Sequence, residues 1–370
     1  MKAAQQHTRR RFGLIAVMGT VTVGLLAGCA GGTAAPDPTS TSAEDEISGN
    51  LVIGGWGGRF TESTKAYLTD PFTEETGVTV QFVDAPGEQV ARLAAMTNAD
   101  KIEWDAVDSL DPSNAFSAYH DGYAAKMPED VRARLEKYVP AEMLTEFGMT
   151  YSASAFVTGC NTDMAEACPT NPEEFFDLEK FPGDRAMIDR PFIALTYALE
   201  ADGVKPEDMF PMDLDRAFDK LETIKDSVKV WYSAGNQMEQ IVRDQQVAMG
   251  LFWSGRAYNT VDQGTNLDIS WDGAVYEPGQ WFVVEGAKNP NAAWALIENI
   301  AANAEGQAKW ATDIAYGISN PEALDFMDEK AAERLPDWPA NFEQSIVPDF
   351  EWYAENREEI EKRWTEFVSG

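Results

Sequence analysis

The chain has 370 residues, which is enough for two domains that each bury a core. It contains 62 acidic against 29 basic residues, and four of the basic residues lie in an N-terminal segment without any acid. The resulting net charge of -33 excludes a broad basic face of the kind that binds nucleic acid or anionic lipid.

The first 29 residues have the features of an export signal. Three arginines, Arg9–Arg11, precede an apolar run, Phe12–Leu26, that is too short and too rich in glycine for a membrane span. The run ends in Leu-Ala-Gly-Cys, which resembles a bacterial lipobox and implies a signal peptide over 1–28 and acylation of Cys29. We therefore expect an exported protein, lipid-anchored to the outer face of the bacterial cytoplasmic membrane, with a disordered tether up to residue 50. Thr8–Phe12 also resembles a twin-arginine signal, so the sequence leaves the export route open.

The remaining cysteines agree with export. If Cys29 carries lipid, Cys160 and Cys168 are the two that remain. A closely spaced pair in an oxidising compartment is typical of a disulfide. It would close a small loop and stabilise the fold by roughly 2–3 kcal/mol.

The first strand of the folded region runs into a glycine-rich loop. Leu51–Gly55 is largely apolar, and Trp56 stands among glycines at positions 54, 55, 57 and 58. Glycine lets the backbone turn tightly and approach a bound group, and the following helix points its free N–H groups at the same place. The pattern fits a ligand-binding loop, and it fits a tight turn around a core tryptophan equally well.

Strands and helices alternate from this loop to residue 119. The expected elements are a helix over Thr61–Thr76 that ends at Gly77, strands over Val78–Asp84 and Trp104–Leu110, and helices over Gly87–Asn98 and Pro112–Tyr119. Such alternation predicts a mostly parallel sheet, in which ligands gather at the carboxyl ends of the strands. Those ends carry Trp56, Asp84, Asp108 and Ser109.

The rest of the chain continues as α/β. The expected strands are Met149–Thr158, Val228–Tyr232, Val247–Trp253 and Ala274–Val284. The expected helices are Pro191–Ala201, Leu214–Lys225, Asn291–Ala302 and a charged C-terminal segment, Glu343–Val368.

Sequence motifs for catalysis are absent. Only His120 remains once the export signal is removed, so a histidine metal cluster cannot form, and neither G-x-S-x-G nor G-x-x-x-x-G-K-[ST] occurs. The glycines at 54–58 miss the spacing of a dinucleotide site, although Asp84 imitates its ribose-binding acid. We expect no cofactor, no metal and no enzyme activity. Acidic residues are plentiful, so an exported hydrolase that uses a carboxylate pair stays an alternative.

An ordered set of segments over about residues 50–365 resembles a known family. The segments are GGWGGRFTESTKAYLTDPFTEETGVTV, WDAVDSLDPS, DLDRAFDKLETIK, VWYSAGNQ, QVAMGLFWSGRAYNTVDQGT, WFVVEGAKNPNAAWALIENI and AYGISNPEAL. Together with the lipobox, they resemble the extracellular solute-binding proteins of ABC importers, in the spermidine/putrescine-binding group. The resemblance implies a monomer that captures a small solute and delivers it to a permease with its ATPase.

The fold that this resemblance implies is the two-lobed α/β fold of periplasmic binding proteins, type II, which closes over its ligand. Met149–Thr158 and Ala274–Val284 would be the strands that cross between the lobes. Lobe one would comprise 51–153 and 275–325, and lobe two 154–274. Residues 326–370 would be C-terminal helices without an assigned lobe.

The resemblance also implies a ligand site. Trp56 and Gly57 match the first-strand loop of the family, and Ser109 matches a ligand-facing hydroxyl. Trp253 matches the aromatic wall of lobe two, and Tyr316 matches a site tyrosine, although core positions explain both rings as well. The complete set of candidate ligand-binding residues is Trp56, Gly57, Gly58, Arg59, Asp108, Ser109, Arg190, Ser233, Trp253, Arg256, Glu277, Gln280, Trp281 and Tyr316.

The charged residues depart from the polyamine pattern. A buried ammonium needs carboxylates and aromatic faces, yet Gln280 stands where the family has an acid, and two more expected acids fall near Arg190 and Ile193. Arginine suits a carboxylate, and Glu277 can hold an amine. One arginine and one acid fit a zwitterion, such as an amino acid or a γ-aminobutyrate-like molecule, so polyamine and zwitterion both stay open. A third alternative is a surface lipoprotein that binds partners without a small ligand.

Overall fold

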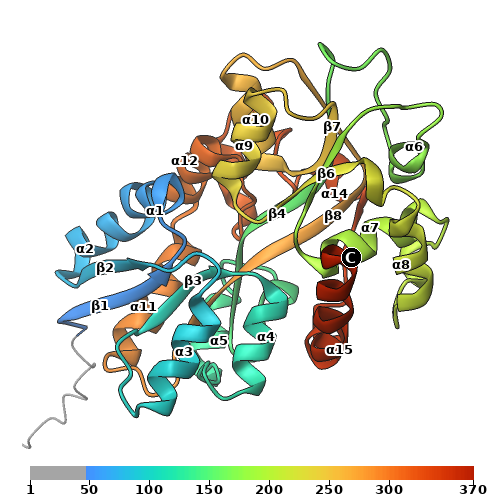
Figure 1. The fold of residues 1–370 in the computed structure, drawn as a ribbon. Coiled ribbons are helices and arrows are strands. Elements are labelled where there is room, and N and C mark those ends of the chain that lie inside the picture. The colour runs from blue at the N-terminus through green and yellow to red at the C-terminus, as the bar shows by residue number, and fades with distance from the viewer. Residues whose placement is uncertain (1–46) are drawn as a thin grey trace, which may run out of the picture. The chain divides into compact units, whose positions relative to one another are not determined.

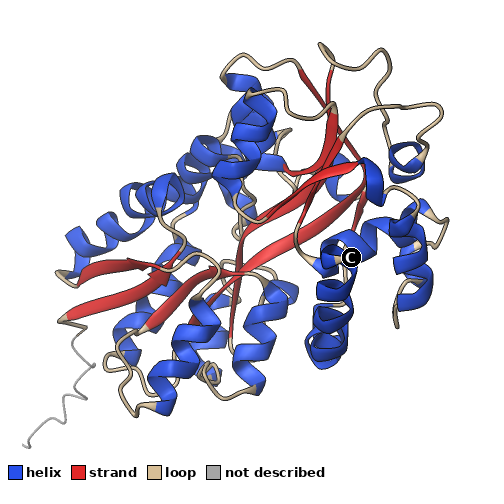
Figure 2. Cartoon of the chain, viewed as in Figure 1, coloured by secondary structure: helices blue, strands red, loops and turns tan. Residues whose placement is uncertain are grey.

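The computed structural model describes residues 47–370, apart from the side chain of Glu142. The predicted signal peptide, the predicted lipidation site Cys29 and the predicted tether up to residue 46 lie outside the described residues. Within residues 47–370, no helix is both long and apolar enough to cross a membrane. These residues form a single sheet with helices on both of its faces (Figure 2).

The strands of this sheet follow the alternation expected from the sequence. In the described part of the chain they are β1 (Asn50–Gly55), β2 (Thr79–Asp84), β3 (Ala106–Leu110), β4 (Gly148–Asn161), β5 (Arg185–Ile188), β6 (Val228–Tyr232), β7 (Met249–Trp253), β8 (Leu267–Val283) and β9 (Ser345–Ile346). The first strand begins at Asn50, which the sequence had suggested as the end of the tether.

The sheet is mixed, so the expectation of a mostly parallel sheet is wrong at its centre. The strand order is β2-β1-β3-β8-β4-β7-β5-β6, with β9 beside β8. The group β1, β2 and β3 is parallel, and so is the group β5, β6 and β7. Between them β4 and β8 pair antiparallel with each other and with one strand of each group (Figure 1). The chain passes to the second group along β4 and returns along β8, which forces these two strands to run in opposite directions.

Helices connect and cover the strands. They are α1 (Gly58–Thr64), α2 (Asp70–Thr76), α3 (Gln89–Asn98), α4 (Pro112–His120), α5 (Glu129–Leu135), α6 (Pro172–Phe176), α7 (Pro191–Ala201), α8 (Leu214–Glu222), α9 (Gly235–Arg243), α10 (Ser254–Asp262), α11 (Pro290–Ala302), α12 (Ala304–Ile314), α13 (Glu329–Ala332), α14 (Pro339–Phe342) and α15 (Phe350–Ser369). A π-helical turn, η1 (Lys65–Thr69), joins α1 to α2, and short 3₁₀ turns cover Ala141–Met143, Pro206–Asp208, Lys225–Ser227 and Pro321–Phe326.

Several local predictions are confirmed. Helix α7 has the predicted bounds, and α2 ends at Gly77, whose φ of 77° is the left-handed conformation that glycine adopts at helix ends. Cys160 and Cys168 form the expected disulfide, with their Cα atoms 5.7 Å apart.

Hydrophobic side chains form separate cores at the two ends of the sheet. The first core packs around β1 and β3, with Leu51 and Trp310 on one face and a smaller cluster containing Leu93 on the other. The second core packs around β5, β6 and β7 and contains Leu195 and Phe252. Because each fully buried side chain of this kind contributes about 1.5–3 kcal/mol, each end of the sheet has its own source of stability.

The C-terminal helix begins later than predicted. The expectation of helix from Glu343 is wrong, because β9 and a turn come first, and α15 starts after Asp349, whose carboxylate caps it by accepting the Trp352 N–H at 2.9 Å. Tyr353 and Trp364 of α15 pack in the second core, and the helix also lies beside α4 (Figure 1). The last helix thus belongs to the second core and touches the first.

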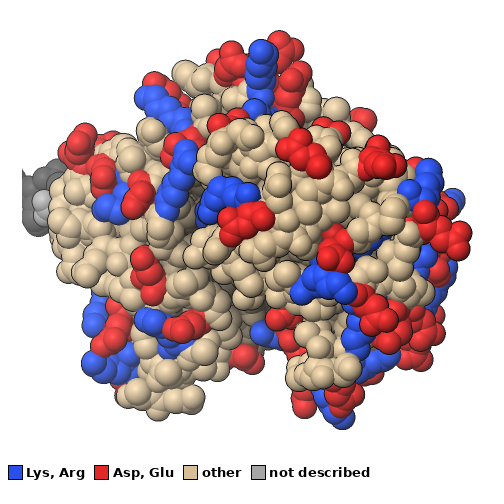
Figure 3. All heavy atoms as spheres, turned by 45° about the horizontal axis from the view of Figure 1, so that its top comes forward, with Lys and Arg blue, Asp and Glu red and all other residues tan. Residues whose placement is uncertain are grey.

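Surface charge is diffuse. On the face drawn in Figure 3, acidic side chains stand next to basic ones over much of the surface. Exposed ion pairs such as Arg92–Glu88 and Arg216–Asp202 are part of this pattern.

Candidate functional site

A cavity of about 680 Å³ lies between the two cores. Its walls come from the segments that follow β1, β2, β3, β5, β6 and β7, from the middle of β4 and β8, and from Tyr316 after α12. These are the carboxyl ends of the parallel strands, where the sequence places the ligand. Eleven of the predicted ligand-binding residues line the cavity: Trp56, Gly57, Gly58, Arg59, Ser109, Arg190, Ser233, Trp253, Arg256, Glu277 and Tyr316.

Irregularities in three neighbouring strands shape the floor. The pairing of β3 with β8 shifts register after Val107, and that of β4 with β8 shifts after Tyr151. Ser109 and Ser152 take left-handed φ angles of 50° and 60° at these shifts, which turns both residues to the cavity. A Cβ at Gly279 of β8 would lie 2.5 Å from the Ser152 hydroxyl oxygen, so only glycine fits between them.

The sequence suggested that the backbone of the glycine-rich loop comes close to a bound group. In the structure it comes close to another side chain of the protein. Gly57 has a φ of 76°, and a Cβ there would lie 2.7 Å from a carboxylate oxygen of Asp84. Gly58 also has a positive φ, with open space around it. The indole N–H of Trp56 donates to the Ser109 carbonyl at 2.9 Å, which fixes the ring against the floor. Backbone conformation therefore determines the shape of this wall.

A buried ion pair dominates the opposite wall. Arg190 lies at the N-terminus of α7, and its Nη1 donates to Oε1 of Glu277 on β8 at 2.6 Å. The guanidinium centre of Arg190 lies 5.2 Å from the ring centroid of Trp253, the last residue of β7. The side chain of Arg190 is 24% exposed and that of Glu277 is 10% exposed. One cation, one anion and one aromatic face thus meet in the cavity wall.

At both Arg190 and Glu277, burial and the charge of the partner side chain shift the pKa in opposite directions. Burial disfavours the charged form of Arg190, but Glu277 and Asp111 outweigh it and raise the pKa of Arg190. Burial also raises the pKa of Glu277, although the charge of Arg190 acts in the opposite direction. Each charge depends on its partner, so a ligand that separates the two side chains has to replace both.

A second arginine stands on the same wall. Arg256 Nη1 donates to Oε1 of Glu239 at 3.0 Å, and Glu239 also accepts hydrogen bonds from Asn259 and Arg243. Burial raises the pKa of Tyr316, while the nearby charge of Arg256 lowers it. Arg256 is thus held by an acid behind it and faces an aromatic hydroxyl across the cavity.

Three predicted ligand-binding residues lie outside the cavity. Gln280 is buried and donates to the Thr150 hydroxyl at 2.7 Å, and Trp281 is fully buried in the first core. Asp108 is fully buried beside Ser109, and neither of its carboxylate oxygens has a hydrogen-bond partner among the described residues. Burial raises the pKa of Asp108 to about 7. The structure therefore gives these three side chains no contact with a ligand in the cavity.

Some cavity residues escaped the sequence analysis. The polar residues among them are Gln89, Asp111, Asn114, Ser152, Ser154 and Asn236. The Asp111 carboxylate caps α4 by accepting the backbone N–H of Asn114 at 3.1 Å, and an Asp-Pro pair before a helix is a readable signal for such a cap. Ser152 has no comparable signal because its exposure follows from the register shift. Across the described part of the chain, no group of three or more His, Cys, Asp or Glu side chains is arranged to hold a metal ion.

Comparisons with known proteins point to one class. Residues 67–342 match the family model of bacterial extracellular solute-binding proteins. The γ-aminobutyric acid-binding protein of Pseudomonas aeruginosa is 29% identical over 334 residues, 89% of this chain and 93% of that protein. The spermidine/putrescine-binding periplasmic protein of Escherichia coli K12 is 21% identical over 84% of this chain and 88% of that protein.

A solved structure is similar over nearly the same length. It is described as the Atu4243-GABA receptor, is 33% identical, and superposes with a TM-score of 0.78 over 86% of this chain and 97% of its own.

Proposed function

Since this chain belongs to the bacterial extracellular solute-binding proteins, we propose that its cavity captures a small zwitterion with a carboxylate and an amino group, such as γ-aminobutyrate. The protein is the solute-binding component of an ABC transporter, as the resemblance implied, and its relatives are binding proteins rather than enzymes. The two-lobed α/β fold is likewise confirmed.

The observation that carries the proposal is the Arg190–Glu277 pair. In the structure the two charges neutralise each other at 2.6 Å inside the cavity wall. A zwitterion supplies both missing partners at once: its carboxylate pairs with the Arg190 guanidinium and its ammonium with the Glu277 carboxylate. The exchange leaves no charge without a partner, and the face of Trp253 borders the same space.

A polyamine fits the same wall less well. Its ammonium groups need carboxylates, but Arg190 already neutralises Glu277, Gln280 is neutral, and Asp108 is buried outside the cavity. Asp111 lines the cavity, but both of its oxygens already accept hydrogen bonds from Ser113 or Asn114. Binding a dication would also bring it close to the positive charge of Arg190. The similarity to proteins described as γ-aminobutyrate binders supports the zwitterion further.

We propose that the ligand is enclosed by closure of the two lobes. Lobe one, residues 51–153 and 275–325, would contain the first core, and lobe two, 154–274, the second core, with β4 and β8 as the crossings. The C-terminal α15 would move with lobe two because it packs in the second core. The closed form would then be presented by a monomer to the permease and its ATPase.

The N-terminal segment completes the proposal. Acylation of Cys29 would anchor the protein to the outer face of the cytoplasmic membrane and keep the receptor near its permease. Mass spectrometry of the membrane-extracted protein would show a diacyl or triacyl mass on the peptide that begins with Cys29, and an unmodified cysteine would contradict the anchor.

Thermal shift of the purified full-length protein tests the ligand class. The panel contains γ-aminobutyrate, α-amino acids, butyrate, butylamine, putrescine and spermidine. At 100 times its dissociation constant, a ligand stabilises the folded state by about 2.7 kcal/mol, enough to raise the melting temperature by several degrees. We expect a shift with a zwitterion and none with butyrate or butylamine alone. A shift with putrescine or spermidine and none with any zwitterion would overturn the proposal.

A further inference from the structure

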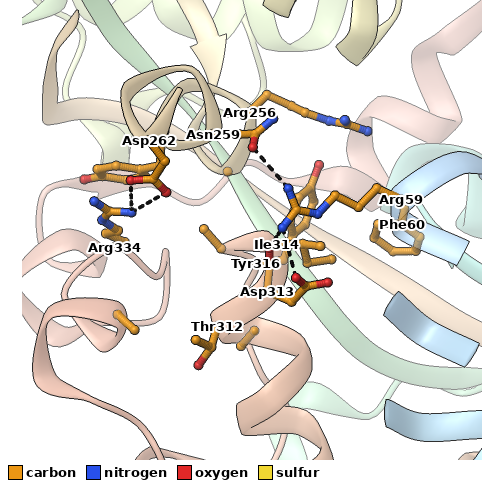
Figure 4. A pocket seen from close by; sticks show the side chains of 15 residues that line it. Arg59, Phe60, Arg256, Asn259, Asp262, Thr312, Asp313, Ile314, Tyr316 and Arg334 are labelled. Atoms are coloured by element: carbon orange, nitrogen blue, oxygen red, sulfur yellow. Dashed lines mark hydrogen bonds and ion pairs between the residues drawn. The ribbon is translucent and has the colours of Figure 1, made fainter. Parts of the chain in front are cut away.

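Helix α10 is the element where the second core meets the first beside the ligand cavity. It follows Trp253 directly and is anchored in the second core by the fully buried Ala257. Arg256, Asn259 and Asp262 recur at every third position, which puts them along one edge of the helix. All three line a second, smaller cavity of about 80 Å³ whose other wall comes from α1, α12 and the residues around α13 (Figure 4).

Asn259 makes the first bridge across this gap. Its Oδ1 accepts a hydrogen bond from Nη1 of Arg59 on α1 at 3.2 Å. The other end of the Arg59 guanidinium is held on its own side, because Nη2 donates to the carboxylate and the carbonyl of Asp313 on α12. Arg59 is thus fixed by the first core and reaches over to the second (Figure 4).

Asp262 makes the second bridge, one turn farther along α10. Both of its carboxylate oxygens accept from Nη1 of Arg334, at 2.9 and 2.8 Å. The Arg334 guanidinium also lies 5.0 Å from the ring centroid of Tyr258. The residue that follows it, Leu335, is fully buried in the first core, so Arg334 belongs to that side.

The bridges and the ligand cavity share residues. Arg59, Phe60, Arg256 and Tyr316 line both cavities. Arg256 and Asn259 also bind the same carboxylate, that of Glu239, at 3.0 Å each. A displacement of α10 therefore moves Arg256 and the end of β7 in the ligand cavity together with both bridges.

We propose that α10 is a latch: Asn259 and Asp262 dock lobe two on Arg59 of lobe one and on Arg334 beside the first core, and hold the cavity closed. The bridging side chains are partly exposed, between 35 and 56% for Arg59, Arg334 and Asp262. Exposed pairs of this kind are individually weak and therefore reversible, which suits a contact that breaks when the lobes open and re-forms when they close. A small gap lies between the bridges, whereas at the start of α10 Gly255 packs closely against the backbone of Ile314 and Ala315, where a Cβ would lie 2.7 and 2.9 Å from their carbonyl oxygens.

The latch predicts an opening of the ligand-free protein when both bridges are removed. In the full-length variant Asn259→Ala/Arg334→Ala, we expect small-angle scattering to give a larger radius of gyration. We expect hydrogen exchange of the α10 peptide to rise at least about threefold, since fewer contacts protect its exposed edge. The matched control is Arg216→Ala, which removes an arginine–carboxylate pair of similar exposure, with Asp202, on the surface of lobe two and away from α10. Wild-type scattering and exchange in the double variant, or an equal change in the control, would overturn the latch.

A charge swap separates a latch from damage to the fold. Asp262→Arg and Arg334→Asp each place two like charges opposite one another, and each should open the protein. The combination of both restores an ion pair with reversed direction, and we expect it to return the radius of gyration and the exchange toward the wild-type values. A combined variant no more closed than either single one would show that the pair does not hold the lobes. Neither measurement uses a ligand, so both are independent of the identity of the solute.

Discussion

The two walls of the ligand cavity present their polar groups by different means. On the side of the first core, the wall consists of a glycine loop, Trp56 fixed by a backbone carbonyl, and Ser109 in a left-handed conformation. On the side of the second core, charged side chains dominate: Arg190 lies against Trp253 and Arg256 against Glu239. Glu277, from the crossing strand β8, completes the charges. The charged wall selects which groups a ligand carries, and the backbone wall limits the shape that fits between them.

This difference sets the order of expected effects. A buried charge that loses its partner is costly, whereas a backbone wall changes through strain of one or two kcal/mol at a time. Substitutions on the charged wall should therefore affect binding most, and substitutions on the backbone wall less.

The largest effect is expected for Arg190→Ala. It removes the carboxylate partner of the ligand and leaves Glu277 buried without a cation, a change of about 3–5 kcal/mol for pairs of this type. Affinity for γ-aminobutyrate, measured by titration calorimetry, should fall at least about 100-fold. Arg190→Lys keeps the charge but not the planar fork, and should lose less. Wild-type affinity in Arg190→Ala would show that the ligand carboxylate binds elsewhere. Loss of putrescine binding in this variant, with γ-aminobutyrate binding intact, would mean that the ligand is a polyamine and not a zwitterion.

Trp253→Ala should come next. The ring borders the cavity and lies against the Arg190 guanidinium, so its loss removes aromatic contact with the ligand and support for the arginine. We expect affinity to fall about tenfold or more. The matched control is Trp231→Ala, a tryptophan that packs against Trp364 of α15 and does not line the cavity. Equal affinities for the wild type and Trp253→Ala would assign the ring to the core.

The backbone wall is tested by comparing Gly57→Ala with Gly58→Ala. Both positions have positive φ, so both substitutions introduce strain, and the strain is larger at Gly57, whose ψ of 178° puts it in a region that essentially only glycine adopts. Only at Gly57 does the new Cβ also meet a neighbour, the Asp84 carboxylate 2.7 Å away. We expect Gly57→Ala to displace the Trp56 loop and weaken binding several-fold, and Gly58→Ala to lower the melting temperature with little change in affinity. Identical affinities for the two variants would mean that this wall does not shape the site.

The residues that the sequence named on both walls line the cavity, but its floor was predicted only in part. Arg190 and Glu277 were named for their charge, and Trp253 was named from the resemblance. Ser152 was not named, because a register shift between β4 and β8 depends on how two distant segments pair. The antiparallel centre of the sheet was missed for the same reason.

The irregular end of β3 explains an error at single-residue scale. Asp108 and Ser109 were both predicted to face the ligand, but the left-handed φ of 50° at Ser109 turns only that residue to the cavity. Ser109 lines the cavity, and Asp108 is buried out of its reach. Residue type marked the correct strand end, and only the three-dimensional pairing decides which of the two side chains reaches the cavity.

The smallest effect on binding is expected at Asp108, although it should alter stability in a pH-dependent way. Burial raises its pKa from the ordinary 3.8 to about 7, so the folded protein holds this proton more tightly than the unfolded chain does. Its contribution to stability is therefore present at low pH and is lost as the pH rises toward 7. Asp108→Asn stays neutral, so its melting temperature should exceed that of the wild type by a margin that grows from pH 4 to pH 7 and then levels off.

A second buried carboxylate provides the control for Asp108. Asp105 accepts backbone N–H groups from Val52 and Asn289, each at 2.9 Å, so its two oxygens are satisfied where those of Asp108 are not. Asp105→Asn replaces one carboxylate oxygen with an NH₂ group, which then faces the backbone N–H of Val52 or Asn289 without a hydrogen bond. It should therefore lower the melting temperature at every pH. Opposite signs for two aspartates on the same segment would show that hydrogen-bond partners, rather than burial alone, decide what a buried carboxylate does to stability. Parallel melting curves for the wild type and Asp108→Asn across pH 4–8 would instead mean that Asp108 has partners in solution that lower its pKa.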